Sequence, residues 1–69
     1  MPVTIWRLKD LTGVVTRCTI VPEENESCEL RLEQGDEVLY VEHHPRIEAA
    51  LLRANAMWID RQLDGWTEE

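Results

Sequence analysis

The spacing of apolar and polar residues predicts four β-strands in the first two thirds of the chain. We expect these strands at residues 3–8, 14–21, 28–33 and 38–42. The third is the clearest, because Cys28, Leu30 and Leu32 alternate with charged residues, as in a strand with one buried face. The second is rich in β-branched side chains, which suit the pleated surface of a sheet.

Short connections between these strands favour an antiparallel meander. The segment 22–27 is acidic and contains a proline, so we expect a solvated loop there. Gly35 can take the positive φ that a tight turn requires between the third and fourth strands. Folding the chain about this turn pairs Leu32 with Leu39 and leaves Tyr40 on the other face. A register shifted by one residue would exchange Tyr40 with its neighbours.

A continuous helical pattern predicts one long helix at residues 45–64. Pro45 suits the first helical turn, and Gly65 suits the position just beyond the last one. Trp66 can then fold back over Arg61. The predicted fold class is α+β, with a four-stranded antiparallel sheet and one C-terminal helix packed on one face, in a single domain that spans the chain.

The predicted helix has apolar residues on two nearly opposite sides. One stripe is wide enough to cover a sheet and consists of Ile47, Ala50, Leu51, Ala54, Met57 and Trp58. The other has the alternating spacing of a coiled-coil seam and consists of Ala49, Leu52, Ala56, Ile59 and Leu63. One sheet normally covers one face of a helix, so we expect the second stripe to contact another copy in an antiparallel homodimer, with Trp66 at its end.

Two alternatives to this homodimer remain open. A strongly curved sheet could bury both stripes within one chain, or the second stripe could bind a different protein. The homodimer is favoured because a domain of 69 residues buries only a small core, and twofold pairs are the commonest oligomers.

Charge narrows the range of partners. Fourteen acidic residues outnumber seven basic ones, which gives a net charge of -7 and repels nucleic acids and anionic membrane surfaces. No apolar run is long enough to cross a bilayer, and the N-terminal residues do not resemble a secretory signal. We therefore expect a cytoplasmic protein with no membrane partner and with nucleic acid disfavoured as a partner.

Cysteine and histidine residues offer little catalytic chemistry. Cys18 and Cys28 are expected to be free thiols in a reducing cytosol, although a cross-strand disulfide is geometrically feasible. A zinc site that combines them with His43 or His44 would lack the short ligand spacings of known sites. No nucleophile motif or phosphate-binding loop is present. We expect no enzyme activity, no cofactor and no metal.

One face of the predicted sheet is a candidate for binding single-stranded nucleic acid. Arg7, Arg17 and Arg31 belong to three different strands and could line one face together with Tyr40. Arginine beside an aromatic ring can stack on bases. Four strands followed by a dimerising helix resemble the topology of the whirly and Pur families of single-strand binders, which implies such a role without a matching motif. A cross-strand charge ladder with neighbouring glutamates is the structural alternative.

The acidic residues suggest the opposite use of charge. A compact acidic dimer could imitate the phosphates of a duplex and inhibit a basic nucleic-acid-binding protein. The residues that would form this surface are Glu23, Glu24, Glu26, Glu29, Glu33, Asp36 and Glu37.

The favoured prediction is simpler than either role with nucleic acid. It is a small acidic homodimer that serves as a protein-interaction or adaptor module without catalytic activity, and its partners are itself and another protein. The segment Trp6–Leu8, the hairpin at Gly35 and the helix end at Gly65 resemble short bacterial proteins built as a strand meander followed by a helix. That resemblance implies no activity and no site residues.

Overall fold

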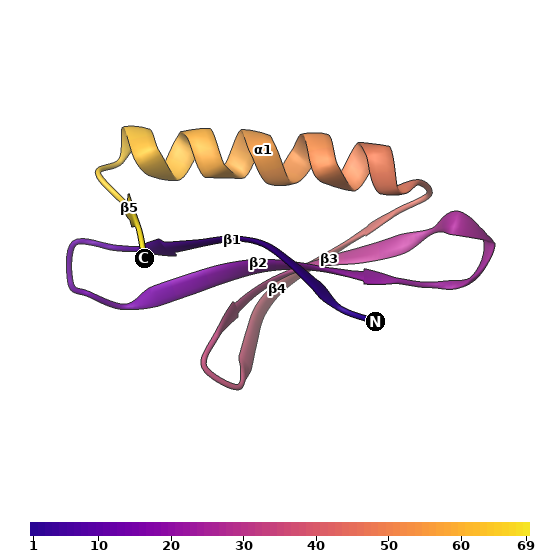
Figure 1. Cartoon of the computed structure of the whole chain (residues 1–69), viewed down its shortest axis with the longest axis horizontal. Coiled ribbons are helices and arrows are strands. Elements are labelled where there is room, and N and C mark those ends of the chain that lie inside the picture. Colours follow the sequence, from indigo (N-terminus) through magenta and orange to yellow (C-terminus); the bar gives the residue numbers. More distant parts are fainter.

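The computed structural model describes residues 1–69 and shows an antiparallel sheet with a helix across one face (Figure 1). The elements are β1 (Val3–Lys9), β2 (Val15–Pro22), β3 (Cys28–Gln34), β4 (Glu37–His44), α1 (Ile47–Leu63) and β5 (Thr67–Glu68), with a short 3-10 turn (Glu24–Glu26) between β2 and β3. The predicted α+β class, with an antiparallel sheet and one C-terminal helix, is confirmed. The predicted number of strands is wrong, because the sheet has five.

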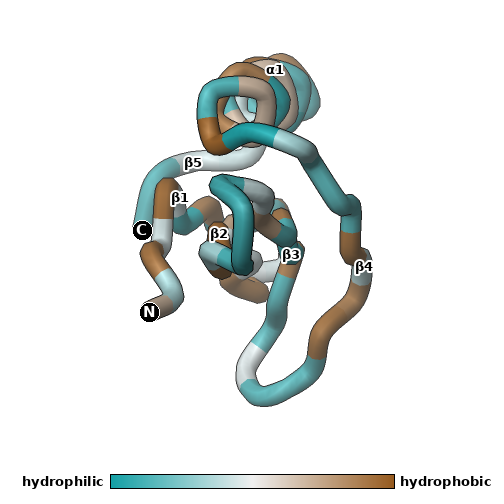
Figure 2. The backbone as a smooth tube through the Cα atoms, turned by 90° about the vertical axis from the view of Figure 1, so that its right-hand side faces the viewer, coloured by the Kyte–Doolittle hydropathy of each residue, from teal (hydrophilic) through white to brown (hydrophobic).

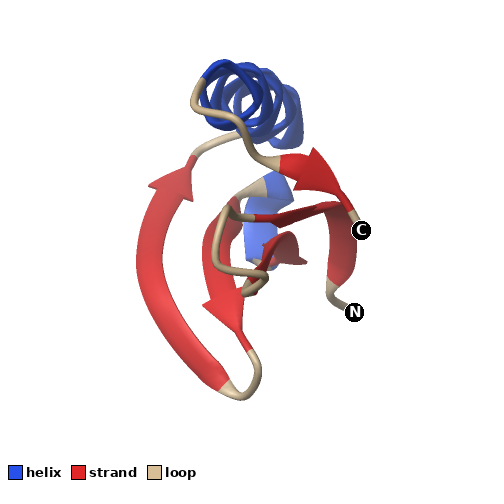
Figure 3. Ribbon diagram, turned by 90° about the vertical axis from the view of Figure 1, so that its left-hand side faces the viewer, coloured by secondary structure: helices blue, strands red, loops and turns tan.

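The strands lie in the order β4-β3-β2-β1-β5. Viewed along the helix, the sheet curves, and the turn between β3 and β4 lies at the end farthest from α1 (Figure 3). β4 forms one edge of the sheet and pairs only with β3. This edge carries a run of hydrophobic positions (Figure 2), and Val38, Leu39, Tyr40 and Val41 are each 40% to 47% exposed.

The fifth strand forms because the chain reverses sharply after the helix. Gly65 has a φ of 92°, and its N–H donates to the carbonyl of Gln62. The N–H of Trp66 donates to the carbonyl of Arg61 at 3.0 Å, which completes a Schellman motif. The following residues then pair with β1. A strand of two polar residues has no apolar alternation, so the sequence pattern did not predict it.

The register between β3 and β4 differs from the predicted one by one residue. Leu32 lies opposite Tyr40, whereas the sequence analysis paired it with Leu39. A bulge between Leu32 and Glu33 leaves Leu39 without a partner. Because opposed residues share a face, Tyr40 lies on the side of the sheet that faces the helix.

The hydrophobic core lies between the sheet and α1. Its larger cluster contains Trp6, Leu8, Cys18, Leu30, Leu32, Ala54 and Met57, and a smaller one contains Ile20, Cys28 and Ala50. The two alanines let the helix approach the sheet closely. The indole N–H of Trp6 crosses this layer and donates to the carbonyl oxygen of Ala54 at 2.8 Å.

Candidate functional site

The side of α1 that faces away from the sheet is an uncovered apolar surface. We call it the outer helix face, and it consists of Ala49, Leu52, Ala56, Ile59 and Leu63. Leu52 is 74% exposed, Leu63 81% and Ile59 45%, while Ala56 is exposed and Ala49 is half-buried. Figure 1 shows α1 as the outermost layer of the molecule. No other element of this chain packs on the outer helix face.

The two predicted apolar stripes occupy different environments in the structure. Ala50, Ala54 and Met57 of the first stripe are buried against the sheet, and Trp58 packs against the same core. The curved sheet does not reach the second stripe, so one chain does not bury both. No helix is long and apolar enough to cross a membrane. The outer helix face is the apolar stripe that the chain leaves uncovered.

Trp66 does not extend the outer helix face. Its side chain is half-buried and packs against the core together with Trp58. The guanidinium carbon of Arg61 lies 5.5 Å from the centre of the Trp66 ring, as the sequence predicted for the end of the helix. Trp66 thus anchors the chain end to its own fold.

The three arginines proposed as a binding face lie together on the open sheet face, the side opposite the helix. Arg7 lies directly across from Arg17 on the neighbouring strand. Arg31 lies opposite Thr19, which is two residues along β2 from Arg17. Tyr40 lies on the helix side of the sheet, so the structure does not bring it to these arginines. The open sheet face therefore lacks the aromatic ring that the single-strand binding hypothesis placed there.

A carboxylate also accompanies each of these arginines. The pairs are Arg7 with Glu69 at 3.5 Å, Arg17 with Glu33 at 3.2 Å, and Arg31 with Glu29. Arg17 also donates to the carbonyl oxygen of Gly35 at 2.5 Å. Only Arg17 and Glu33 are directly opposed on neighbouring strands, whereas Arg31 and Glu29 belong to the same strand. The arrangement therefore matches only in part the cross-strand charge ladder that the sequence analysis gave as the structural alternative.

Four polar side chains connect the edge strand β4 to the helix, and we call them the β4–helix network. Glu42 accepts hydrogen bonds from the hydroxyl of Tyr40 at 2.5 Å and from Nε of Arg53 at 3.0 Å. Nε2 of His44 lies 2.8 Å from the other carboxylate oxygen. Burial alone would raise the pKa of Glu42, but these hydrogen bonds and the positive charge of Arg53 lower it to about 2. The carboxylate is thus ionised and fully engaged, which suits a structural clamp better than a general base.

The two cysteines are free and buried on the helix side of the sheet. Cys18 lies opposite Leu32, whereas Cys28 lies opposite Pro22 farther along β2, so they do not meet across the strands. Burial raises the pKa of the Cys18 thiol to about 11, and burial also raises the pKa of Cys28. Protonated, inaccessible thiols are poor nucleophiles and poor metal ligands.

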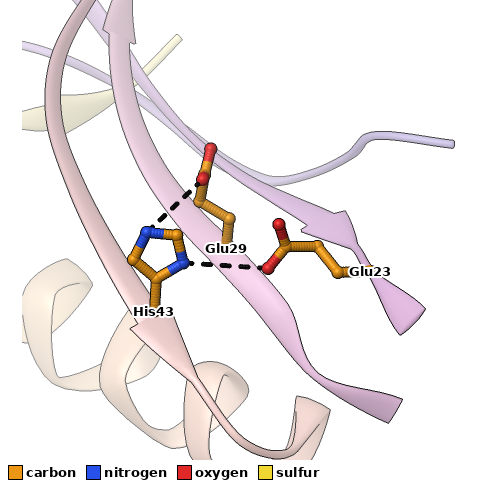
Figure 4. Close-up of side chains that lie close together, drawn as sticks. All are labelled: Glu23, Glu29 and His43. Atoms are coloured by element: carbon orange, nitrogen blue, oxygen red, sulfur yellow. Dashed lines mark ion pairs between the residues drawn. The ribbon is translucent and has the colours of Figure 1, made fainter. Parts of the chain in front are cut away.

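A second polar cluster lies on the open sheet face near the β2–β3 connection (Figure 4). We call it the open-face cluster, and it consists of Glu23, Glu29 and His43. Nδ1 of His43 lies 3.7 Å from Glu23, and its Nε2 lies 3.7 Å from Glu29. The sequence analysis missed this cluster because its members are far apart in the chain. The signal that could have found it was the register, which places Glu29 opposite His43.

An open groove lies between α1, β1 and the C-terminal residues. Its volume is about 810 Å³, and Ile5, Leu51 and Trp58 provide part of its apolar lining. Its charged residues include Arg7 and Glu69, which pair with each other. The groove contains no cysteine, histidine or serine, and its two carboxylates, Glu68 and Glu69, are exposed at the end of the chain.

Neither the protein-family models, nor the curated proteins, nor the solved structures compared with this chain include a match.

Proposed function

We propose that this chain is a non-catalytic interaction module that forms a homodimer through the outer helix face. One observation carries the proposal: a helix whose inner side is buried presents Leu52, Ile59 and Leu63 to solvent on its outer side. A helix with two apolar sides is stable in water when both sides are covered. A second copy supplies the same apolar seam.

The spacing of the outer helix face suits antiparallel pairing of two α1 helices. A twofold axis near Ala56 brings Leu52 of one copy toward Ile59 of the other, and Ala49 toward Leu63. Large residues then meet small ones at the ends of the contact, and Ala56 at the centre allows the helix axes to approach to about 8–10 Å.

The apolar area is sufficient for reversible association. Burying Leu52, Ile59 and Leu63 on both copies contributes on the order of 10 kcal/mol, at about 1.5 to 3 kcal/mol per side chain before discounting what is already buried. Loss of translational and rotational freedom opposes this by about 4 to 15 kcal/mol. A dimer of moderate affinity, rather than an obligate one, is the expected result.

An adaptor role requires a further protein partner, and the surfaces left free by this dimer would receive it. The acidic-mimic hypothesis stays a prediction, because no specific arrangement of carboxylates favours it over ordinary surface charge. The single-strand binding hypothesis loses its aromatic residue, since Tyr40 lies on the helix side.

Sedimentation equilibrium on the wild-type protein and on a Leu52→Glu, Leu63→Glu double variant tests the proposal. Wild-type protein should sediment as a dimer, and the double variant as a folded monomer, because both side chains are largely exposed within one copy. Circular dichroism should show the same helix content in both.

Leu11→Glu is the matched control, because Leu11 is 83% exposed but lies outside the helix. This variant adds one negative charge at an exposed leucine and should leave the dimer intact. A wild-type protein that stays monomeric at its highest attainable concentration would rule out the homodimer.

A further inference from the structure

The open-face cluster brings together three potential metal ligands from different parts of the chain. Glu29 on β3 and His43 on β4 are direct cross-strand partners. Glu23 follows β2 and is held near them by the hydrogen bond from its N–H to the carbonyl of Ser27 at 2.9 Å. One ligand atom from each member of the cluster lies within 4.8 Å of the others.

The spacing within the cluster is close to that of a coordination sphere. Each nitrogen of His43 faces a carboxylate oxygen at 3.7 Å, which is longer than a hydrogen bond. Zinc binds imidazole nitrogen and carboxylate oxygen at about 2.0 to 2.2 Å, so neighbouring ligand atoms in a tetrahedral site are about 3.4 Å apart. The two 3.7 Å distances involve different nitrogens of the His43 ring, so a side-chain rotation is needed to bring both carboxylates and one nitrogen onto one ion.

One member of the cluster is already fixed, and the other two can adjust. The Glu29 side chain is 15% exposed, and Nε of Arg31 donates to its Oε1, which leaves Oε2 directed toward His43. Such an outer partner orients a ligating carboxylate. The His43 side chain is 70% exposed and that of Glu23 is 43% exposed. One ion binds only one imidazole nitrogen, and the two nitrogens of His43 face different carboxylates. Either the His43 ring or the Glu23 side chain must therefore rotate, which is feasible because both are exposed.

The charge of the cluster also favours a cation. In the β4–helix network, the neighbouring histidine and glutamate already have the guanidinium of Arg53 as their positive partner. The open-face cluster has two carboxylates but only one adjacent guanidinium, from Arg31. Glu24 and Glu26 in the same connection add further negative charge. A divalent cation would neutralise this excess.

We propose that Glu23, Glu29 and one imidazole nitrogen of His43 bind a divalent first-row transition-metal ion of the zinc type, with water completing its coordination. Imidazole nitrogen favours such ions over Mg²⁺ and Ca²⁺, which require more oxygen ligands. The bound ion ties the β2–β3 connection to the free edge strand β4. The site is independent of the proposed dimer, because its residues lie on the opposite side of the molecule from the outer helix face.

Calorimetric titration of untagged, chelator-treated protein with ZnCl₂ tests the site. We expect one Zn²⁺ per chain and a rise of several degrees in Tm, because an ion that binds only the folded state stabilises it. His43→Gln and Glu23→Gln should each weaken binding about 10-fold or more, since each removes a ligand. In the nitrogen NMR spectrum of the histidine side chains, Zn²⁺ should shift a resonance of His43 and not of His44.

Glu24→Gln is the matched control for Glu23→Gln. It lies in the same connection and removes the same charge, but it is not part of the cluster. Glu24→Gln should weaken Zn²⁺ binding far less than Glu23→Gln does, because it removes the same charge but no ligand, and MgCl₂ should not compete. Equal binding by the wild type, His43→Gln and Glu23→Gln would overturn the site, as would absence of Zn²⁺ binding. Repeating the titration on the Leu52→Glu, Leu63→Glu variant keeps the result separate from the state of the dimer.

Discussion

Glu42 is the residue on which the attachment of the free sheet edge to the helix depends. It accepts hydrogen bonds from Tyr40 on its own strand and from Arg53 on α1, while His44 contacts its other oxygen. Its lowered pKa means that the folded chain holds the ionised form more favourably than the unfolded chain does. The stability that this provides is complete above the ordinary value of 4.5, and it is lost as the pH falls from 4.5 toward 2.

Replacing Glu42 with Gln should lower the free energy of unfolding by about 2 kcal/mol at neutral pH, because hydrogen bonds to a charged acceptor are lost. The loss of stability between pH 4.5 and 2 should also become shallower than in the wild type. Urea unfolding at several pH values measures both effects. Glu37→Gln is the control, because Glu37 is exposed on the same strand and makes no ion pair. If Glu42→Gln lost as much stability between pH 4.5 and 2 as the wild type does, other carboxylates would be the cause of that loss.

The sequence predicted the environment of some single residues and not of others. The alternation in residues 28–33 correctly predicts which side chains of β3 are buried, because period two requires no knowledge of the neighbouring strands. The predicted side of the sheet for Tyr40 was wrong. Its side depends on a bulge between Leu32 and Glu33 that has no clear sequence signal. The same register decides that Glu29 meets His43. A shift of one residue in the β3–β4 register therefore changes both the side of the sheet on which Tyr40 lies and the partner of Glu29.

At the scale of elements, the end of α1 determines whether the fifth strand exists. Gly65 has a φ of 92°, which residues with a Cβ rarely adopt. A Cβ added at this position would lie 3.4 Å from Cδ2 of Leu11. The turn it makes directs Trp66 onto the core and β5 onto β1.

Gly65→Ala should destabilise the fold by about 1 to 2 kcal/mol, the usual cost of a left-handed conformation for a residue with a Cβ. It should also increase hydrogen exchange at the amides of β5. Gly65→Asn should cost less, because asparagine tolerates this region better. Amide exchange and thermal unfolding of the two variants measure the difference. Equal stability in wild type and Gly65→Ala would show that the turn does not constrain β5.

The elements differ in how far the sequence predicted them, and length explains the difference. The helix spans enough residues for both apolar stripes to emerge from the 3.6-residue period. Ala50, Ala54, Met57 and Trp58 of the first stripe pack on the sheet, but Ile47 and Leu51 stay exposed, so that part of the prediction is wrong. β5 has two residues, both polar, so periodicity carries no information about it. β5 forms because Gly65 reverses the chain and Trp66 anchors it to the core. The sequence predicted both of these features but not the strand that they produce.

At the scale of the whole molecule, the proposed dimer would form against the charge of its two copies. Each carries a net charge of -7, so bringing two together is electrostatically unfavourable. The proposed interface is apolar and gains little from ion pairs. Salt should therefore strengthen it by screening the repulsion between the copies.

Raising the NaCl concentration from about 0.05 M to about 0.5 M shortens the screening length to a few ångströms and should lower the dissociation constant of the dimer several-fold. Sedimentation at a series of salt concentrations measures this change. The Leu52→Glu, Leu63→Glu variant should remain monomeric throughout the series. A dimer that weakens with salt would instead point to an interface held by opposite charges.

The exposed edge of β4 gives this excess of carboxylates a protective role that requires no binding partner. A long strand with half-exposed apolar side chains and one unpaired row of backbone groups is a template for sheet extension between molecules, the first step toward insoluble aggregates. Mutual repulsion keeps such edges apart in a crowded solution. Removing charge from the chain is therefore expected to shorten its lifetime in concentrated solution before it alters the fold.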